Sequence, residues 1–419
     1  MNIIKNNIDK VVFVFVVVGI LSTAITIVYD VVLFYDFVAF YAIISFGYLF
    51  YRYLFGVINY PLHVLKYNDI NYTPSVSIIL PCFNEETEIL KRCIISACLN
   101  KYPHKEIIVI NDGSTDKITW KTIRELRKTY NFEALTYEKN RGKRHAMALG
   151  FRKAKNEVII TMDSDSVITS DTAIFELVKP MIDRKIGAVS GCILVHNTNK
   201  TILTKMQDAR YWLAFFLEKS SQSIYNGVTC ASGPFSAYRG EYLNKYLDEW
   251  ENQEFLGVKC TYGDDRGLTT FMLRNGYGIR FSRDAILYTD VPETLSKFIR
   301  QQIRWKKSFI RENWYLSKFI VEMNMLMCFE FIFFWIVFIC GFITKTIIVL
   351  MLISGHLPWI NFALMLLFVT FVHNIYMFIK VPGTRGYYGV LYGLFNEFIV
   401  SWLFFYSFIT LKNSKWGTR

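Results

Sequence analysis

Two carboxylates separated by one residue, Asp163 and Asp165, follow a short apolar run at residues 158–162. Carboxylate oxygens suit Mg²⁺ and Mn²⁺, and a cation held in this way can bridge a diphosphate and neutralise a leaving group. Asp163 and Asp165 could therefore hold a divalent cation. The alternative is a loop in which these aspartates cap a helix.

Two further segments have the composition of a nucleotide-sugar site. Asp112 lies in a turn after residues 106–110, where its carboxylate could read a base or a ribose; an Asx turn is the alternative. Lys143 and Arg144 follow the flexible Gly142, and this basic segment could close on a diphosphate. A solvated basic loop is the equally plain alternative.

An acidic pair, Asp264 and Asp265, stands between Gly263 and Arg266 just before a helix-like segment. A general base must be held near the hydroxyl that it deprotonates, and one carboxylate of this pair could supply it. The alternative is helix capping, which would use either aspartate equally well.

The segment Gln301-Gln302-Ile303-Arg304-Trp305 lies within a basic amphipathic stretch, residues 293–311. Such a stretch is typical of a helix lying on the cytoplasmic membrane surface. That interpretation explains the lysines but not the paired glutamines. Trp305 could stack on a sugar ring, and the planar guanidinium of Arg304 could grip a phosphate.

The elements that must position these residues follow an alternating pattern from Ser75 onward. Short apolar runs predict strands at 76–80, 106–110, 134–137 and 158–162, and helices are expected at 86–99, 121–130 and 145–154. Strands alternating with helices indicate a parallel sheet whose ligands bind at the carboxyl ends of the strands. Asp112, Asp163 and Asp165 all fall at such ends.

Composition places this domain beside a membrane. The 419 residues are 53% hydrophobic, 17% aromatic and only 20% charged, and 47 Lys+Arg against 35 Asp+Glu give a net charge of +12. Soluble domains carry about 25% charged residues, so the chain is too apolar to be wholly soluble. Disordered chains have low hydrophobicity, and this chain has high hydrophobicity. The sequence has no basic tract interleaved with aromatic residues, which is the pattern that would indicate nucleic-acid binding. The eight cysteines form no CxxC pair, which favours a reducing compartment without a zinc site or disulfide framework.

Five long apolar runs predict the membrane region: 11–29, 31–58, 325–353, 358–379 and 387–411. Basic residues flank the first hairpin and the link 380–385, so these sides, both chain termini and the catalytic domain are expected to be cytoplasmic. Three complete crossings after the domain could not return the C-terminus to that side. We therefore predict that 387–411, which carries Asn396 and Glu397, is re-entrant.

The order of these motifs resembles the processive membrane glycosyltransferases of family 2: a strand-end Asp, DxD, an acidic pair, then QxxRW. Within that family, several segments resemble the hyaluronan synthases, namely 211–214, 218–219, 230–234, 238–239, 255–257, 263–266, 307–309, 311–312 and 416–419. Rhizobial chitin-oligomer synthases share 211–214 and the QxxRW region. The resemblance covers residues 70–419 closely.

The resemblance implies a role for each motif. Asp112 would contact the uridine, and Asp165 with Asp163 would hold Mg²⁺ or Mn²⁺ on the diphosphate. Lys143, Arg144 and Asp264 would lie at the nucleotide sugar, and Asp265 would deprotonate the acceptor. Gln301, Arg304 and Trp305 would form the acceptor platform, with Trp416 and Arg419 in a segment that closes over UDP.

The same resemblance implies a glycosyltransferase A-type (Rossmann-like) α/β domain combined with α-helical transmembrane segments and amphipathic interface helices. The expected regions are a transmembrane hairpin (1–66), the catalytic domain (67–290), interface helices (291–323), a second transmembrane region (324–411) and a gating tail (412–419). An integral plasma-membrane protein, compatible with a monomer, would transfer N-acetylglucosamine and glucuronate alternately from UDP-N-acetylglucosamine and UDP-glucuronate to a nascent polysaccharide and extrude the polymer past membrane lipids. A chitin-type synthase is the alternative, and a non-catalytic export component is a further one.

Overall fold

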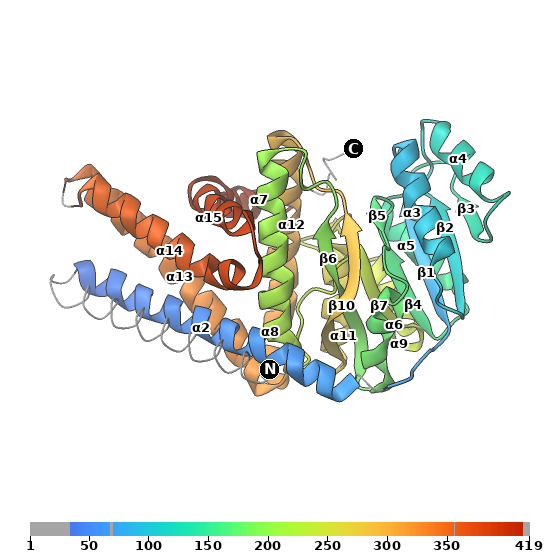
Figure 1. Cartoon of the computed structure of the whole chain (residues 1–419), viewed down its shortest axis with the longest axis horizontal. Coiled ribbons are helices and arrows are strands. Elements are labelled where there is room, and N and C mark those ends of the chain that lie inside the picture. The colour runs from blue at the N-terminus through green and yellow to red at the C-terminus, as the bar shows by residue number, and fades with distance from the viewer. Residues whose placement is uncertain (1–33, 68–69, 356, 414–419) are drawn as a thin grey trace.

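The computed structural model describes residues 34–67, 70–355 and 357–413. The predicted membrane run 11–29 and the predicted site residues Trp416 and Arg419 lie outside the described residues. Elsewhere the predicted combination of an α/β domain with long apolar helices is confirmed (Figure 1).

The first half of the sheet matches the predicted alternation. Strands β1 (Val76–Cys82), β2 (Lys105–Asn111), β3 (Glu133–Thr136) and β4 (Val158–Met162) run parallel, and their connections contain α3 (Thr87–Leu99), α4 (Ile118–Leu126) and α5 (Lys143–Lys153). All residues of β1 and β4 are buried, as expected for strands covered on both faces. Helix α4 begins three residues before the predicted start because Asp116 Oδ1 accepts from the Thr119 N–H.

The second half of the sheet departs from the predicted parallel arrangement. The strand order is β3-β2-β1-β4-β7-β6-β10-β5, and β7 (Phe235–Arg239) runs antiparallel to both β4 and β6 (Ile186–Val195). Strand β10 (Gly278–Thr289) pairs parallel with β6 and antiparallel with β5 (Ser166–Val167). The sheet is therefore mixed, and only its first four strands follow the sequence prediction.

Shorter elements complete the catalytic domain. They are α6 (Ala173–Val178), η1 (Lys179–Ile182), α9 (Gly240–Lys245), α10 (Leu247–Glu251), β8 (Glu254–Phe255), β9 (Val258–Lys259), α11 (Asp264–Arg274) and η3 (Ile320–Glu322).

Three helices in the described part of the chain are long and apolar enough to cross a membrane: α2 (Phe34–Tyr67), α13 (Met325–Ile353) and α14 (Trp359–Lys380). After them, α15 (Arg385–Phe395) and the π-helix η4 (Asn396–Val400) meet α16 (Leu403–Ile409) at a 40° bend. Such a pair is either one broken span or a re-entrant loop, so re-entry of 387–411 stays a prediction.

Two helices stand between the sheet and the long apolar helices in Figure 1: α7 (Ile202–Leu213) and α12 (Leu295–Ser317). Helix α7 continues into a π-helix, η2 (Ala214–Lys219), and then α8 (Ser220–Ser223). Helix α12 extends beyond the predicted amphipathic stretch 293–311. Its side chains Gln302, Lys307, Ser308, Arg311 and Glu312 are buried, so α12 packs within the protein and is not simply a helix with a solvated polar face.

Candidate active site

The carboxylates Asp163 and Asp165 follow β4 at the edge where the parallel strands end, and they lead directly into strand β5. No helix begins there, so the alternative of helix-capping aspartates is wrong. The Lys143 ammonium donates to Asp163 Oδ1, and the Thr289 hydroxyl donates to Asp165 Oδ1 at 3.0 Å. The two aspartates thus sit between the start of α5 and the end of β10.

Electrostatics at this edge favour a bound cation. Burial, together with the negative charges of Asp163 and Glu85, raises the pKa of Asp165 to about 7. Glu85, which follows β1, accepts from the Ser164 hydroxyl at 2.6 Å, so a third carboxylate borders the pair. Lys143 alone does not compensate this negative charge. Burial lowers the pKa of Lys143, but Asp163 outweighs that effect, so the pKa of the ammonium lies above its ordinary value.

The donor set fits Mg²⁺ or Mn²⁺ bound together with a substrate. Among the described residues, no group of three or more His, Cys, Asp or Glu side chains is arranged to hold a metal ion. Mg²⁺ is commonly bound by one or two carboxylates, with substrate phosphates and water completing its octahedron. Asp163 and Asp165 match that pattern, because they supply two carboxylates and leave the remaining positions open.

Asp112 is buried and organises the loop that starts α5. Its carboxylate accepts from the backbone N–H groups of Arg141 and Gly142, each at 2.9 Å, and from Asn140 Nδ2 at 2.9 Å. Burial raises its pKa, although these two backbone N–H donors act in the opposite direction. The side chain that bonds back to this turn is that of Asn111 and not that of Asp112, because Asn111 Oδ1 accepts from the Ser114 N–H. Contact between Asp112 and a uridine stays a prediction.

Arg144 and Asp264 form a buried ion pair, with Arg144 Nε 2.8 Å from Asp264 Oδ1 and the two side chains 3% and 4% exposed. Arg144 Nη1 also donates to the carbonyl of Trp250 and to Gln253 Oε1. The alternative of a solvated basic loop is therefore wrong for Arg144. The structure brings this predicted pair of site residues together, but their observed partners are each other and the neighbouring loop.

Asp265 is half-buried at the start of α11, and its carboxylate has a fixed orientation. Oδ2 accepts from the Gly233 N–H at 3.1 Å and from Cys230 Sγ at 3.6 Å, and Oδ1 accepts from the Arg266 N–H at 2.8 Å. Helix capping does not explain the acidic pair, since neither carboxylate caps from the N-cap position, which is Gly263.

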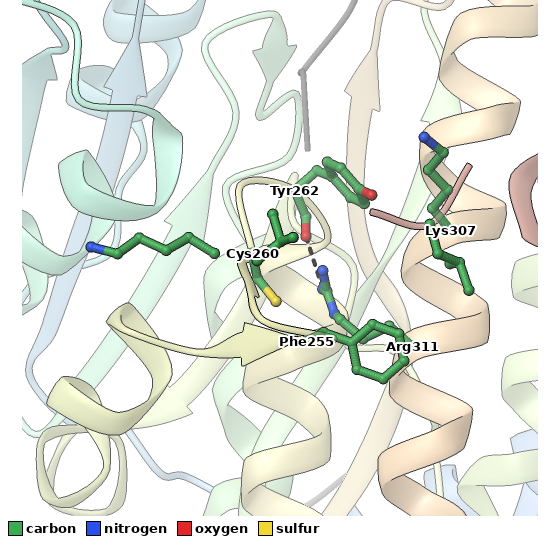
Figure 2. Close-up of a pocket in the computed structure, with 8 residues that line it drawn as sticks. Phe255, Cys260, Tyr262, Lys307 and Arg311 are labelled. Carbon is green, nitrogen blue, oxygen red and sulfur yellow. Dashed lines mark hydrogen bonds between the residues drawn. The ribbon is translucent and has the colours of Figure 1, made fainter. Parts of the chain in front are cut away.

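Gly263 brings the acidic turn into direct contact with α12. Its φ is +73°, a conformation that L side chains rarely adopt, and a Cβ placed there would lie 1.9 Å from Ser308 Oγ. Arg311 secures the same contact, because its Nη2 donates to the carbonyl of Tyr262 at 2.8 Å (Figure 2). Arg311 is itself paired with Glu312 in the interior. The turn that carries Asp265 is thus fixed to the helix that carries QxxRW.

On α12, Trp305 is partly exposed, with 42% of the residue accessible to solvent. Its ring centroid lies 6.4 Å from that of Tyr211 on α7, at an interplanar angle of 46°. Gln301 Oε1 is buried without a hydrogen-bond partner in the described part of the chain, so an acceptor is available there. Arg304 lies one position before Trp305 on the same helix. These features suit a sugar-binding platform.

The described chain ends beside the same turn. Asn413 offers its carbonyl to Lys307 Nζ at 3.1 Å and to the Tyr262 hydroxyl at 3.4 Å. Lys307 and Tyr262 line a small pocket with Cys260 and Arg311 (Figure 2). The last described residue therefore lies beside the acidic turn, and the closing role of Trp416 and Arg419 stays a prediction.

Sequence reasoning gave no role to Lys219, Gln253 or Thr289, although each contacts a predicted site residue or the loop that holds one. For Lys219 a signal existed, since Glu218 and Lys219 follow a run of seven apolar and aromatic residues, 211–217, where charges need partners. No comparable pattern marked Gln253 or Thr289.

The chain resembles known glycosyltransferases in sequence and in fold. The glycosyl transferase family 2 model matches residues 77–247. A hyaluronan synthase of Streptococcus pyogenes is 32% identical over 362 residues, covering 82% of this chain and 83% of that protein. An N-acetylglucosaminyltransferase of Rhizobium meliloti is 31% identical over 359 residues, covering 83% and 82%. A mannosyltransferase from Pyrobaculum calidifontis, solved in complex with GDP-Man and Mn²⁺, shares the fold with a TM-score of 0.55 at 16% identity, over 84% of this chain and 99% of its own.

Proposed function

Because the chain belongs to glycosyl transferase family 2, with hyaluronan synthases among its relatives, we propose that this glycosyltransferase alternately transfers N-acetylglucosamine and glucuronate from UDP-sugars to a growing hyaluronan chain. The observation that carries the proposal is the contact between Gly263 and Ser308. It joins the turn of Asp265 to the helix of Trp305, so a base and an acceptor platform belong to one rigid unit.

In the proposed reaction, Trp305 stacks on the terminal sugar of the acceptor and Asp265 takes the proton of its hydroxyl. The acceptor oxygen attacks the anomeric carbon from the face opposite the diphosphate, so a new glycosidic bond forms with inversion while the bond to UDP breaks. Lys143, beside Asp163, stands near the departing diphosphate. Asp163 and Asp165 would hold a divalent cation, which would neutralise charge on that leaving group.

The substrate assignment rests on the curated relatives and is tested by the product. Purified protein in lipid, given both radiolabelled UDP-sugars, should make a polymer that hyaluronidase degrades. A chitinase-sensitive product from UDP-N-acetylglucosamine alone would establish the second candidate, a chitin-type synthase. The 31% identity to the rhizobial N-acetylglucosaminyltransferase is the observation that keeps this candidate in view.

The base assignment has its own test in Asp265→Asn. The amide oxygen can still accept from the Gly233 N–H, so the local structure should survive while the base is lost. Polymer extension should fall on the order of 100-fold or more, with UDP binding unchanged. Near-normal polymer yield would remove Asp265 as the base.

We further propose that the catalytic domain and both chain termini face the cytoplasm, as the basic flanks indicate, and that the apolar helices conduct the product outward. The three helices long enough to cross a membrane support an integral membrane location. A protease-protection assay on sealed vesicles would report the side on which the domain lies.

A further inference from the structure

Lys219, the last residue of η2, is an ammonium surrounded by neutral oxygens. Its Nζ donates to the carbonyl of Cys230 at 2.6 Å, to Ser190 Oγ at 3.2 Å and to Ser232 Oγ. In the part of the chain that the structure describes, no carboxylate forms an ion pair with it. Burial lowers its pKa, and the nearby Cys230 and Asp265 oppose this effect only in part. Such a group is costly to bury, so its position needs an explanation.

The explanation lies in the segment that Lys219 holds, residues 230–233, which we call the base-facing segment. One side of this segment bonds to Lys219 through the Cys230 carbonyl and the Ser232 hydroxyl. Its other side bonds to Asp265 Oδ2 through the Gly233 N–H and the Cys230 thiol. The base-facing segment is therefore clamped between a cation and the carboxylate proposed as the base.

The π-helical backbone of η2 directs two adjacent charged side chains to different partners. Glu218 accepts from Arg210 Nη1 at 2.7 Å and from Nη2 at 3.1 Å, and Arg52 of α2 lies 4.0 Å away. Lys219, the next residue, turns toward the base-facing segment instead. An extra residue in a helical turn is a frequent device at functional sites. The ion pair of Glu218 thus anchors the backbone from which Lys219 reaches.

The number of donors decides between two uses of Lys219. An ammonium has three N–H donors, and all three are engaged by protein oxygens. A lysine that contacted a substrate carboxylate directly would keep at least one donor for it. The bonding pattern is that of a lysine that holds a loop in place.

We propose that Lys219 is a positioning residue that fixes the base-facing segment and thereby orients Asp265 for proton abstraction. This inference rests on the proposed function, because it takes Asp265 to be the base. The charge of Lys219 also acts on that carboxylate. The other charged or titratable groups that face Asp265 are Lys143 from α5, Tyr238 from β7, Cys230 and the adjacent Arg266.

The test compares Lys219→Met with Lys219→Arg. Methionine keeps the apolar stem and removes the ammonium, so kcat should fall on the order of 100-fold, the loss expected for a misplaced base. The KM for both UDP-sugars should stay within about twofold, because donor contacts are untouched. Arginine keeps the charge and several donors, and it should restore kcat to within about tenfold of the wild type.

A pH profile separates positioning from a merely structural role. A carboxylate that loses a neighbouring cation holds its proton more tightly, so the acid limb of kcat should move to higher pH in Lys219→Met. Lys105→Met is the matched control. Lys105 Nζ, at the start of β2, bonds to the Asn100 carbonyl at 2.5 Å and to the Tyr102 carbonyl at 3.5 Å, and neither of these residues bonds to Asp265. That variant should leave kcat and its pH profile unchanged.

Three outcomes are decisive. Unchanged kcat and pH profile in Lys219→Met would overturn the inference, and so would an effect confined to the KM of the donors. If methionine prevents folding, judged by lost UDP binding, failure of the arginine variant to give a normal pH profile would overturn it. Asp265→Asn distinguishes the two levels, because an active Asp265→Asn enzyme refutes the base itself, whereas an inactive one beside a normal Lys219→Met refutes only this inference.

Discussion

Replacing Arg144 by methionine tests whether this residue supports the acidic turn or binds the substrate. The two interpretations differ in what they predict. Arg144 is 2% exposed and pairs with Asp264, so the variant would leave a buried carboxylate without its cation. A donor-binding arginine, by contrast, would leave the fold intact and weaken the binding of the UDP-sugar.

The magnitude follows from the burial of both partners. Removing one member of a buried ion pair costs about 3–5 kcal/mol, because the remaining charge is left uncompensated. For a domain of this size, 1 kcal/mol corresponds to about 2–4 °C in Tm, so Arg144→Met should lower the Tm by roughly 6–20 °C. The bonds from Nη1 to Trp250 and Gln253 are lost as well, which favours the upper part of that range.

The assay is thermal unfolding of the detergent-solubilised protein, with Arg152→Met as the control on the same helix. Arg152 is 44% exposed and pairs with the exposed Asp248 and with Glu251, which keeps His145 as a second partner, so the control should change Tm by only a few degrees. The double variant Arg144→Met/Asp264→Asn should recover part of the loss, because no buried charge remains unpaired. A normal Tm in Arg144→Met with a raised KM for UDP-sugars would refute the structural role.

Three further predictions concern other parts of the site. Trp305→Ala should raise the KM for acceptor oligosaccharide by about 2- to 12-fold and lower the Tm by only a few degrees, because the partly exposed ring loses its contact with Tyr211 as well as the sugar. An unchanged KM would exclude the platform. Gly263→Ala should abolish transfer, since its Cβ would lie 1.9 Å from Ser308 Oγ. Adding Ser308→Ala should not restore transfer, because Ser308 Cβ would also be only 2.5 Å away. An active Gly263→Ala enzyme would contradict the packing. Mn²⁺ affinity in the presence of UDP should rise by about tenfold between pH 6 and pH 8. The reason is that Asp165, with a pKa raised to about 7, must lose its proton before it binds a cation. An Mn²⁺ affinity that does not change over this pH range would refute the assignment.

The first four strands could be predicted from sequence because each is a short apolar run bounded by a helix-length segment. β6, β7 and β10 escaped prediction. β7 is buried at all five positions and gives no alternation, and its reversed direction depends on pairing with β4 and β6, which are distant in sequence. Pairing between segments 40 to 80 residues apart is a tertiary property, which local periodicity does not encode.

Residue type and position were enough to select Asp163, Asp165 and Asp265 as candidate site residues, because they lie at a strand end and in a tight turn, and their roles stay predictions. Their partners could not be found in this way. The pairing of Arg144 with Asp264 joins residues 120 positions apart, and only the fold reveals that this arginine faces inward.

The packing of the acidic turn against α12 suggests how a polymerase keeps its acceptor in register. Trp305 and Ser308 are three residues apart on one helix, a separation of about 4.5 Å along the axis that places them on neighbouring faces. Gly263 packs on Ser308, and Asp265 follows Gly263 by two residues. The distance from Trp305 to the proposed base Asp265 is therefore set by a single helix and one tight contact. Helix α12 also packs against α16, so a sugar stacked on Trp305 would be held in register both with Asp265 and with the apolar helices. A shared element of this kind would let successive acceptor ends, whichever sugar they carry, meet the proposed base in the same geometry.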